Sequence, residues 1–192
     1  MTFLTDFADQ AVVLPLVLAV AMVLGLQGWW RGALVWFGAI AGTFAVMLAL
    51  KLFFMGCSGV FGPYALRSPS GHVAAASVIA GGLVVILGRE RALILPIAAL
   101  ATAVIGLTRI GLHVHSWPEV ILGGCVGLVG ALVLVGCCGP PPSLRLSPLI
   151  LTAAVVLGLF HGQHLKAEVV IRQAASDAGL FPEWCHDNAA RQ

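Results

Sequence analysis

The chain has 192 residues, of which 60% are hydrophobic and only 9% are charged, and its mean hydropathy is +1.03. Water-soluble domains carry about 25% charged residues, so this composition excludes a soluble globular protein and predicts an integral membrane protein. The formal net charge of +2, with no run of basic residues, also argues against nucleic acid as a partner.

Six apolar segments follow one another, and crossing the roughly 30 Å hydrocarbon core of a bilayer takes about 20 helical residues. They span approximately residues 11–26, 33–54, 72–87, 93–112, 120–135 and 147–160, and the last is the shortest. Lipid cannot satisfy an open backbone, and the apolar residues do not alternate as in a barrel. We therefore predict an all-α, polytopic membrane helix bundle with about six transmembrane helices over residues 1–162. An amphipathic or disordered tail is expected over residues 163–192.

The cations of the connecting segments favour one orientation in the membrane. One set of alternate loops carries four arginines, Arg31, Arg89, Arg91 and Arg145, opposed only by Glu90. The positive-inside tendency places this set in the cytoplasm. Both chain termini then lie on the periplasmic or extracellular face of the inner (plasma) membrane, together with the two polar segments described next.

The first polar segment, residues 67–72, contains Pro69-Ser70-Gly71-His72 and leads straight into the third apolar run. Ser70 is a typical helix N-cap, and Gly71 lets the backbone approach a ligand closely. The free amides at a helix start favour an anion, and His72 in that turn could donate to a phosphate oxygen or a leaving group. A plain helix cap with an interfacial histidine explains the same tetrapeptide.

The second polar segment, residues 108–119, contains Arg109, His115 and Glu119. Arg109 lies in or just below an apolar run, where a guanidinium usually faces a polar cavity and can bind a phosphate bidentately. Snorkelling to the membrane interface is the alternative. Glu119 completes the Ser-x-x-Glu spacing of a capping box. Alternatively, its carboxylate binds one nitrogen of His115 and leaves the other nitrogen free to attack.

His113 and His115 with Glu119 could also suggest a metal site, because imidazole and carboxylate are zinc ligands. A His-x-His followed by a carboxylate beyond a proline is a weak pattern for such a site. We therefore expect no metal and no other cofactor.

The tetrapeptide of the first segment and the Arg-x5-His-x3-Glu spacing of the second resemble the type 2 phosphatidic acid phosphatase (PAP2) superfamily of membrane lipid phosphatases. The family pattern has three blocks: Lys-x6-Arg-Pro, Pro-Ser-Gly-His and Ser-Arg-x5-His-x3-Asp. The resemblance covers about residues 51–124. Thr108 stands in place of the family serine, and Glu119 in place of its aspartate. In the first block, Lys51 is the candidate lysine, but Ser58 follows where an Arg-Pro pair is expected, and we hypothesise that Arg67 supplies the missing cation.

The resemblance implies a metal-independent, two-step hydrolysis of a lipid phosphate or polyprenyl diphosphate at the bilayer. His115 is the implied nucleophile, oriented by Glu119, and His72 protonates the leaving oxygen and then activates water. The implied phosphate ligands are Lys51, Arg67, Ser70, Gly71 and Arg109. Because the first block is incomplete, a non-catalytic lipid-phosphate binding or transport protein on the same scaffold is the alternative.

Overall fold

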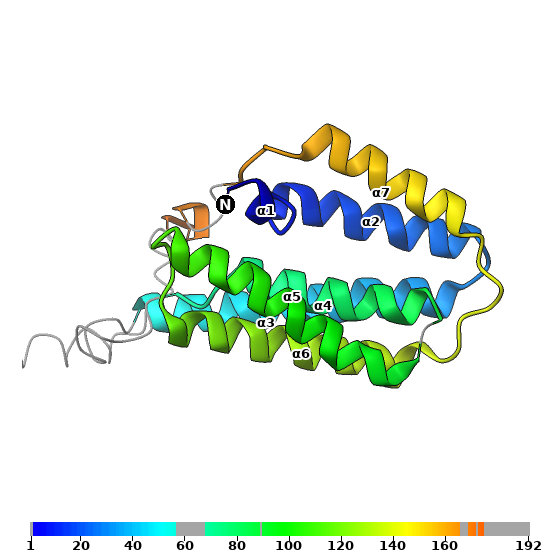
Figure 1. Ribbon diagram of the computed structural model, residues 1–192, viewed down its shortest axis with the longest axis horizontal. Coiled ribbons are helices and arrows are strands. Elements are labelled where there is room, and N and C mark those ends of the chain that lie inside the picture. Colours follow the sequence, from blue (N-terminus) through cyan, green and yellow to red (C-terminus); the bar gives the residue numbers. More distant parts are fainter. Residues whose placement is uncertain (1, 57–67, 89, 166–168, 172, 175–192) are drawn as a thin grey trace, which may run out of the picture.

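The structure, a computed structural model, describes residues 2–56, 68–88, 90–165, 169–171 and 173–174 (Figure 1). Within these ranges it is helical, with no strand. The elements are α1 (Thr2–Asp6), α2 (Gln10–Leu26), α3 (Trp30–Gly56), α4 (Gly71–Ile86), the 3-10 turn η1 (Arg91–Leu93), α5 (Ile94–Gly111), α6 (Trp117–Cys138) and α7 (Leu146–Phe160). The long helices run side by side, and α7 packs on α2 at one side of the bundle.

Each of the six predicted apolar segments coincides with one long helix, which confirms the all-helical fold. Among the described residues, three helical stretches are long and apolar enough to cross a membrane: Trp30–Met55, Arg91–Gly111 and Trp117–Cys138. Helices α2, α4 and α7 are apolar but shorter. Helix length therefore supports three spans directly, and a total of six stays a prediction. The expectation for the tail falls largely outside the described residues.

The two ends of the bundle carry different chemistry. At one end the Arg31 Nε donates to the carbonyl of Cys137 over 2.9 Å, and the Arg145 N–H donates to the Gln27 Oε1 over 2.7 Å. The first turns of α4 and α6 lie at the opposite end (Figure 1). The arginine-bearing loops in the described part of the chain are thus separated from the polar segments, as the alternation of loops predicted. Arg89 lies outside that part.

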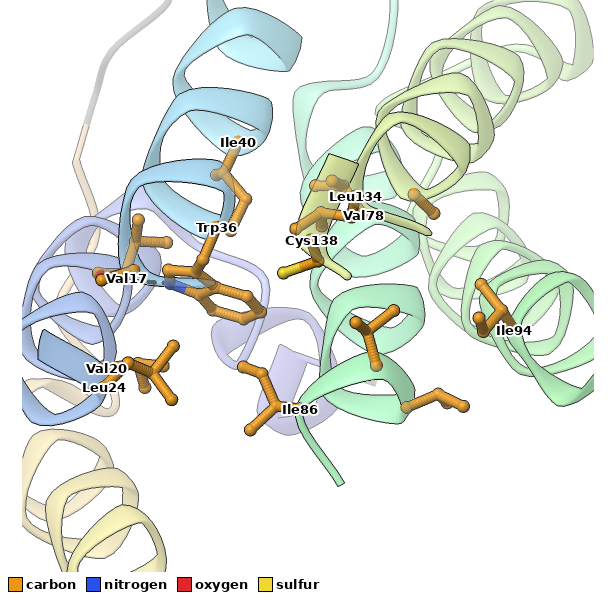
Figure 2. Packing of buried hydrophobic residues seen from close by; sticks show 14 of the residues in the cluster. Val17, Val20, Leu24, Trp36, Ile40, Val78, Ile86, Ile94, Leu134 and Cys138 are labelled. Atoms are coloured by element: carbon orange, nitrogen blue, oxygen red, sulfur yellow. Dashed lines mark hydrogen bonds between the residues drawn. The ribbon is translucent and has the colours of Figure 1, made fainter. Parts of the chain in front are cut away.

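Trp36 on α3 is the centre of the hydrophobic core and is fully buried. Its indole Nε1 donates to the carbonyl of Val17 on α2 over 3.1 Å (Figure 2). The ring also packs in the cluster with Leu24 of α2 and with Val78 and Leu134 of α4 and α6. An indole buries a large apolar area and needs a partner for its N–H, so Trp36 ties α2 to the α3–α4–α6 packing.

Glycines set the distance between α4 and α6. A Cβ added at Gly123 would collide with the carbonyl oxygen of Ser70, and one at Gly127 would lie 2.5 Å from the carbonyl oxygen of Ala74. Small residues of this kind let membrane helices approach until their backbones touch. The first turn of α4 is therefore held directly against α6, and this contact brings the two polar segments together.

Candidate active site

The two polar segments are joined by their backbones and by the Glu119 carboxylate. The Ser70 N–H donates to the carbonyl oxygen of Glu119 over 3.1 Å. The Ser68 N–H donates to Oε1 of Glu119 over 2.9 Å, across 51 residues of sequence. All three residues are buried. The predicted meeting of the first polar segment with the second is therefore present in its described residues, 68–72, and Glu119 is its centre.

The second carboxylate oxygen of Glu119 has two contacts. Oε2 accepts a hydrogen bond from the Ser116 N–H over 2.9 Å, which is the glutamate half of a capping box. The same oxygen lies 3.2 Å from Nδ1 of His115. The two roles that the sequence left open are thus combined in one side chain. A carboxylate beside Nδ1 favours the tautomer that carries its hydrogen there, which leaves a lone pair on Nε2.

His115 has a side chain that is only 7% exposed. Burial lowers its pKa below the ordinary imidazole value, the contact with Glu119 acts in the opposite direction, and the charges of Arg109 and Lys51 lower the pKa further. Both cations are therefore near enough to act on the imidazole. A lowered pKa keeps His115 in the neutral form, which is the form able to act as a nucleophile.

Lys51, near the C-terminal end of α3, places a buried ammonium at the start of α4. Its side-chain Nζ donates to the Ser68 hydroxyl over 2.7 Å. A Cβ added at Gly71 would lie 3.8 Å from Cε of Lys51 and 3.9 Å from Nε2 of Gln10, so both side chains border the Gly71 backbone. A buried ammonium is costly unless hydrogen-bonded or paired with a negative charge. Its position is suited to an anion bound at the first turn of α4.

Ser70 occupies the N-cap position of α4 with an extended backbone (φ −75°, ψ 104°) and is fully buried. Its hydroxyl does not form the predicted capping bond, and it has no hydrogen-bond partner among the described residues. Most buried polar atoms in proteins are hydrogen-bonded. The Ser70 hydroxyl is therefore an available donor beside the free amides of the helix start.

His72 lies in the first turn of α4, with 23% of its side chain exposed. Its Nε2 is 3.6 Å from Oδ2 of Asp9, the N-cap residue of α2. The sequence did not predict this contact. The one signal was a pair of aspartates, Asp6 and Asp9, directly before the first apolar run.

Arg109 is half-buried in the last turn of α5. The preceding residue, Thr108, donates its hydroxyl to the carbonyl of Ile105 over 2.6 Å, so this hydroxyl is engaged within the helix. Of the predicted phosphate ligands, Lys51, Ser70, Gly71 and Arg109 lie in the described part of the chain. Arg67 lies outside it, and its role stays a prediction.

His113 ends helix α5. It has a positive φ of 56°, and its N–H donates to the carbonyl of Ile110 over 2.9 Å, while the Val114 N–H donates to the carbonyl of Arg109 over 3.2 Å. These two bonds are those of a Schellman motif, in which the left-handed residue closes the helix. His113 is exposed. In the ranges that the structure describes, no group of three or more His, Cys, Asp or Glu side chains could hold a metal ion.

Comparison with known protein families gives a match. The sequence profile of the PAP2 superfamily matches residues 54–139, a region that contains both polar segments and helices α4 to α6. Searches of curated proteins and of solved structures gave no match. The resemblance to the PAP2 superfamily drawn from the two motifs is thus confirmed over residues 54–139.

Proposed function

We propose that this protein is an integral-membrane phosphatase that hydrolyses a lipid phosphate or polyprenyl diphosphate through a phosphohistidine at His115. The observation that carries the proposal is the Glu119 carboxylate, which binds the Ser68 N–H with one oxygen and lies against His115 Nδ1 with the other. This arrangement orients the imidazole, and the hydroxyl of the same Ser68 accepts a hydrogen bond from the buried Lys51 ammonium. The PAP2 match supports the same class, because members of the family are generally phosphatases.

In the first step, Nε2 of His115 attacks phosphorus. A P–N bond forms, the P–O bond to the leaving group breaks, and His72 gives its proton to the leaving oxygen. Positive charge develops on the His115 ring during this step, and the Glu119 carboxylate 3.2 Å from Nδ1 stabilises that charge. A placed histidine acid typically contributes about 10²–10⁴-fold in rate.

In the second step, the now neutral His72 takes a proton from water, and the water oxygen attacks phosphorus. The P–N bond breaks, inorganic phosphate leaves, and His115 is restored. Both steps move a phosphoryl group in line between two nucleophiles, which requires positioned donors around the three equatorial oxygens. The scheme uses only side chains and backbone of this chain and needs no cofactor.

The proposed phosphate cradle consists of the Lys51 ammonium, the Ser70 hydroxyl, the Gly71 amide and the Arg109 guanidinium. The unengaged Ser70 hydroxyl and the ammonium bordering Gly71 support this assignment. Arg67, beside the same tetrapeptide, is proposed as a further cation. Replacing Arg67 by alanine is expected to raise KM much as loss of Lys51 does, and an unchanged KM and kcat would remove Arg67 from the cradle.

A groove between α3 and α6 supports a substrate with a hydrocarbon chain. It has a volume of about 450 Å³, within the usual size of ligand sites. It is lined by small and apolar residues: Gly38, Ala39, Gly42, Thr43, Val46, Cys125, Val126, Val129, Gly130 and Val133. Val46 lies five residues from Lys51, and Cys125 lies six from Glu119, which is about 8 Å and about 9 Å of helix. The groove therefore begins one to two turns below the candidate site on both helices.

The proposed location is the inner (plasma) membrane, with the site on the periplasmic or extracellular face. The separation of Arg31 and Arg145 from the site end of the bundle supports it, because cytoplasmic loops are enriched in arginine. A reporter that is active only in the cytoplasm, fused after Gln192, is expected to be silent. An active reporter there would reverse the orientation.

The test of the proposed function is phosphate release from a panel of lipid monophosphates and diphosphates by the detergent-purified protein. Wild type is expected to turn over at least one class, and His115→Ala is expected to lose that turnover. His113→Ala is the matched control, because this exposed histidine lies two residues away and serves the helix end. Binding of a lipid phosphate by wild type without any turnover would support the binding or transport protein instead.

A further inference from the structure

The N-terminal segment, which precedes the region matched by the PAP2 profile, reaches the candidate active site. Ala8 is 3% exposed and packs with Val73 of α4, Ile105 of α5 and Val120 of α6. This contact fixes the start of α2 against the three helices that carry the polar segments. Asp9, the next residue, is consequently buried beside the first turn of α4.

The Asp9 carboxylate is held from two sides by backbone N–H groups. Oδ1 accepts a hydrogen bond from Ala11 over 2.9 Å and another from Leu165, beyond the end of α7, over 3.2 Å. Oδ2 lies 3.6 Å from Nε2 of His72. Burial acts to raise the pKa of Asp9, but the contact with His72 and these hydrogen bonds outweigh it and hold the pKa well below the usual carboxyl range. Asp9 is thus a fixed negative charge facing His72.

We propose that Asp9 is a positioning residue for His72: it orients the imidazole and stabilises the protonated ring that gives its proton to the leaving oxygen. The inference rests on the proposed function, in which His72 is the acid. With Nε2 directed at Asp9, Nδ1 is the nitrogen that serves the leaving oxygen in the first step and water in the second. This assigns to the N-terminal segment a part in the chemistry that the two motifs alone do not contain.

A second imidazole shares the Asp9 carboxylate. Nδ1 of His164 lies 3.4 Å from Oδ2 of Asp9 and 3.8 Å from Oδ1 of Asp6, and the His164 side chain is 59% exposed. In the described part of the chain the Asp6 carboxylate contacts His164, so it offers an aspartate of the same segment that does not face His72. Asp6→Asn is therefore the matched control for changes at Asp9.

The geometry allows the capping role of Asp9 to be separated from its role toward His72. Capping of α2 uses Oδ1, whereas the contact with His72 uses Oδ2. Asparagine caps a helix about as well as aspartate, so Asp9→Asn retains a capping oxygen and removes the negative charge. Asp9→Ser also retains a capping oxygen and provides a second variant if the first unfolds. Thermal unfolding of both variants in detergent establishes that each is folded.

The experiment compares two substrates that differ in their need for an acid. A lipid alkyl phosphate has a poor leaving group that must be protonated, whereas a nitrophenyl phosphate ester has a leaving group that departs without a proton. Asp9→Asn is expected to lower kcat/KM, which reports formation of the phosphohistidine, about 10-fold or more on the alkyl phosphate and much less on the nitrophenyl ester. The ceiling is the roughly 10²–10⁴-fold that a placed acid supplies. Asp9→Glu is expected to restore part of the loss, and Asp6→Asn to behave as wild type.

Equal losses on both substrates would reduce Asp9 to a structural residue, and no loss on either would remove it from the site; each result overturns the inference. Its failure can be told apart from failure of the proposed function by His72→Gln on the same substrates. A selective loss in His72→Gln without one in Asp9→Asn leaves the proposed chemistry standing and rejects Asp9. If the inference holds, the double variant Asp9→Asn/His72→Gln should lose no more activity on the alkyl phosphate than His72→Gln alone. Two residues that act through one group do not have additive effects.

Discussion

Glu119 and His115 contact each other through an oxygen that also caps a helix. Oε2 of Glu119 lies 3.2 Å from Nδ1 of His115 and accepts the Ser116 N–H over 2.9 Å, while Oε1 accepts the Ser68 N–H. The carboxylate cannot rotate without breaking bonds to both polar segments. The orientation of the candidate nucleophile is therefore coupled to the start of α6 and to the loop before α4. The additional methylene of glutamate over the family aspartate is compatible with all three contacts.

Glu119→Gln is expected to lower kcat by about 10²-fold or more, because it removes the charge that stabilises the His115 ring. It also sets an amide against either the buried Ser68 N–H or the partly buried Ser116 N–H, which is expected to cost about 1–3 kcal/mol in the free energy of unfolding. Phosphate release and thermal unfolding in detergent measure the two effects. Glu90→Gln, an exposed glutamate before η1, is the control. Full turnover in Glu119→Gln would show that this carboxylate serves only as a helix cap.

The pH dependence of kcat/KM follows from the direction of the His115 pKa. Because burial and the nearby cations lower that pKa, the imidazole stays neutral to lower pH, and the acidic limb should lie below the ordinary imidazole value of about 6.5. Lys51→Met removes a contribution that lowers the pKa and should move the limb to higher pH. Glu119→Gln removes one that raises it and should move the limb to lower pH. The titration of the substrate phosphate is measured separately and subtracted. An acidic limb at or above a pH of about 6.5 in wild type would refute the assignment of this limb to a His115 with a lowered pKa.

Gly123→Ala is expected to push α6 away from Ser70, because the added methyl group meets a carbonyl oxygen that cannot move independently of its backbone. Overpacking of this kind costs about 1–3 kcal/mol, and the separation of the polar segments should lower kcat as well. Gly136→Ala on the same helix is the control, since nothing lies within 4 Å of its added Cβ. Equal stability and activity in the two variants would mean that the α4–α6 contact does not set the site.

Gly42→Leu tests the groove between α3 and α6. An added Cβ at Gly42 meets nothing within 4 Å, so the larger side chain can enter the groove without displacing a helix. We expect KM to rise about 10-fold or more for a long-chain lipid phosphate, since each buried methylene contributes about 0.8 kcal/mol. A short-chain, water-soluble phosphate should be unaffected. Gly136→Leu, outside the groove, is the control, and an equal effect on both substrates would contradict a chain-binding groove.

Much of the fold was predictable because apolar segments separated by polar loops specify helices. The capping-box spacing located the start of α6 at Ser116, and the alternation of helices predicted that both polar segments lie at one end. The number of spans was less predictable. Helices α2, α4 and α7 are apolar but shorter than the usual length of a membrane span. Sequence hydropathy does not show how such short helices pack against their neighbours.

Contacts between distant segments were the least predictable part of the site. The spacing of Glu119 fits both a cap and a partner for His115, and only the positions of its two oxygens show that it makes both contacts. Asp9 gave no motif, because its contact with His72 depends on the residues just before α2 lying against the first turn of α4. His113 was considered as a metal ligand by spacing, whereas its left-handed backbone shows that it closes α5.

The most direct test of the account is to trap the covalent intermediate during turnover. Phosphohistidine is labile in acid, so the reaction with a lipid phosphate is stopped by denaturation at alkaline pH and the peptides are mapped by mass spectrometry. The account predicts a phosphoryl group on the peptide that contains His115 and its absence in His115→Ala. With a nitrophenyl phosphate ester, whose leaving group departs without a proton, the phosphoryl group should accumulate in His72→Gln, whose second step lacks its base. Phosphate release by wild type with an unmodified His115, or continued turnover in His115→Ala, would contradict it.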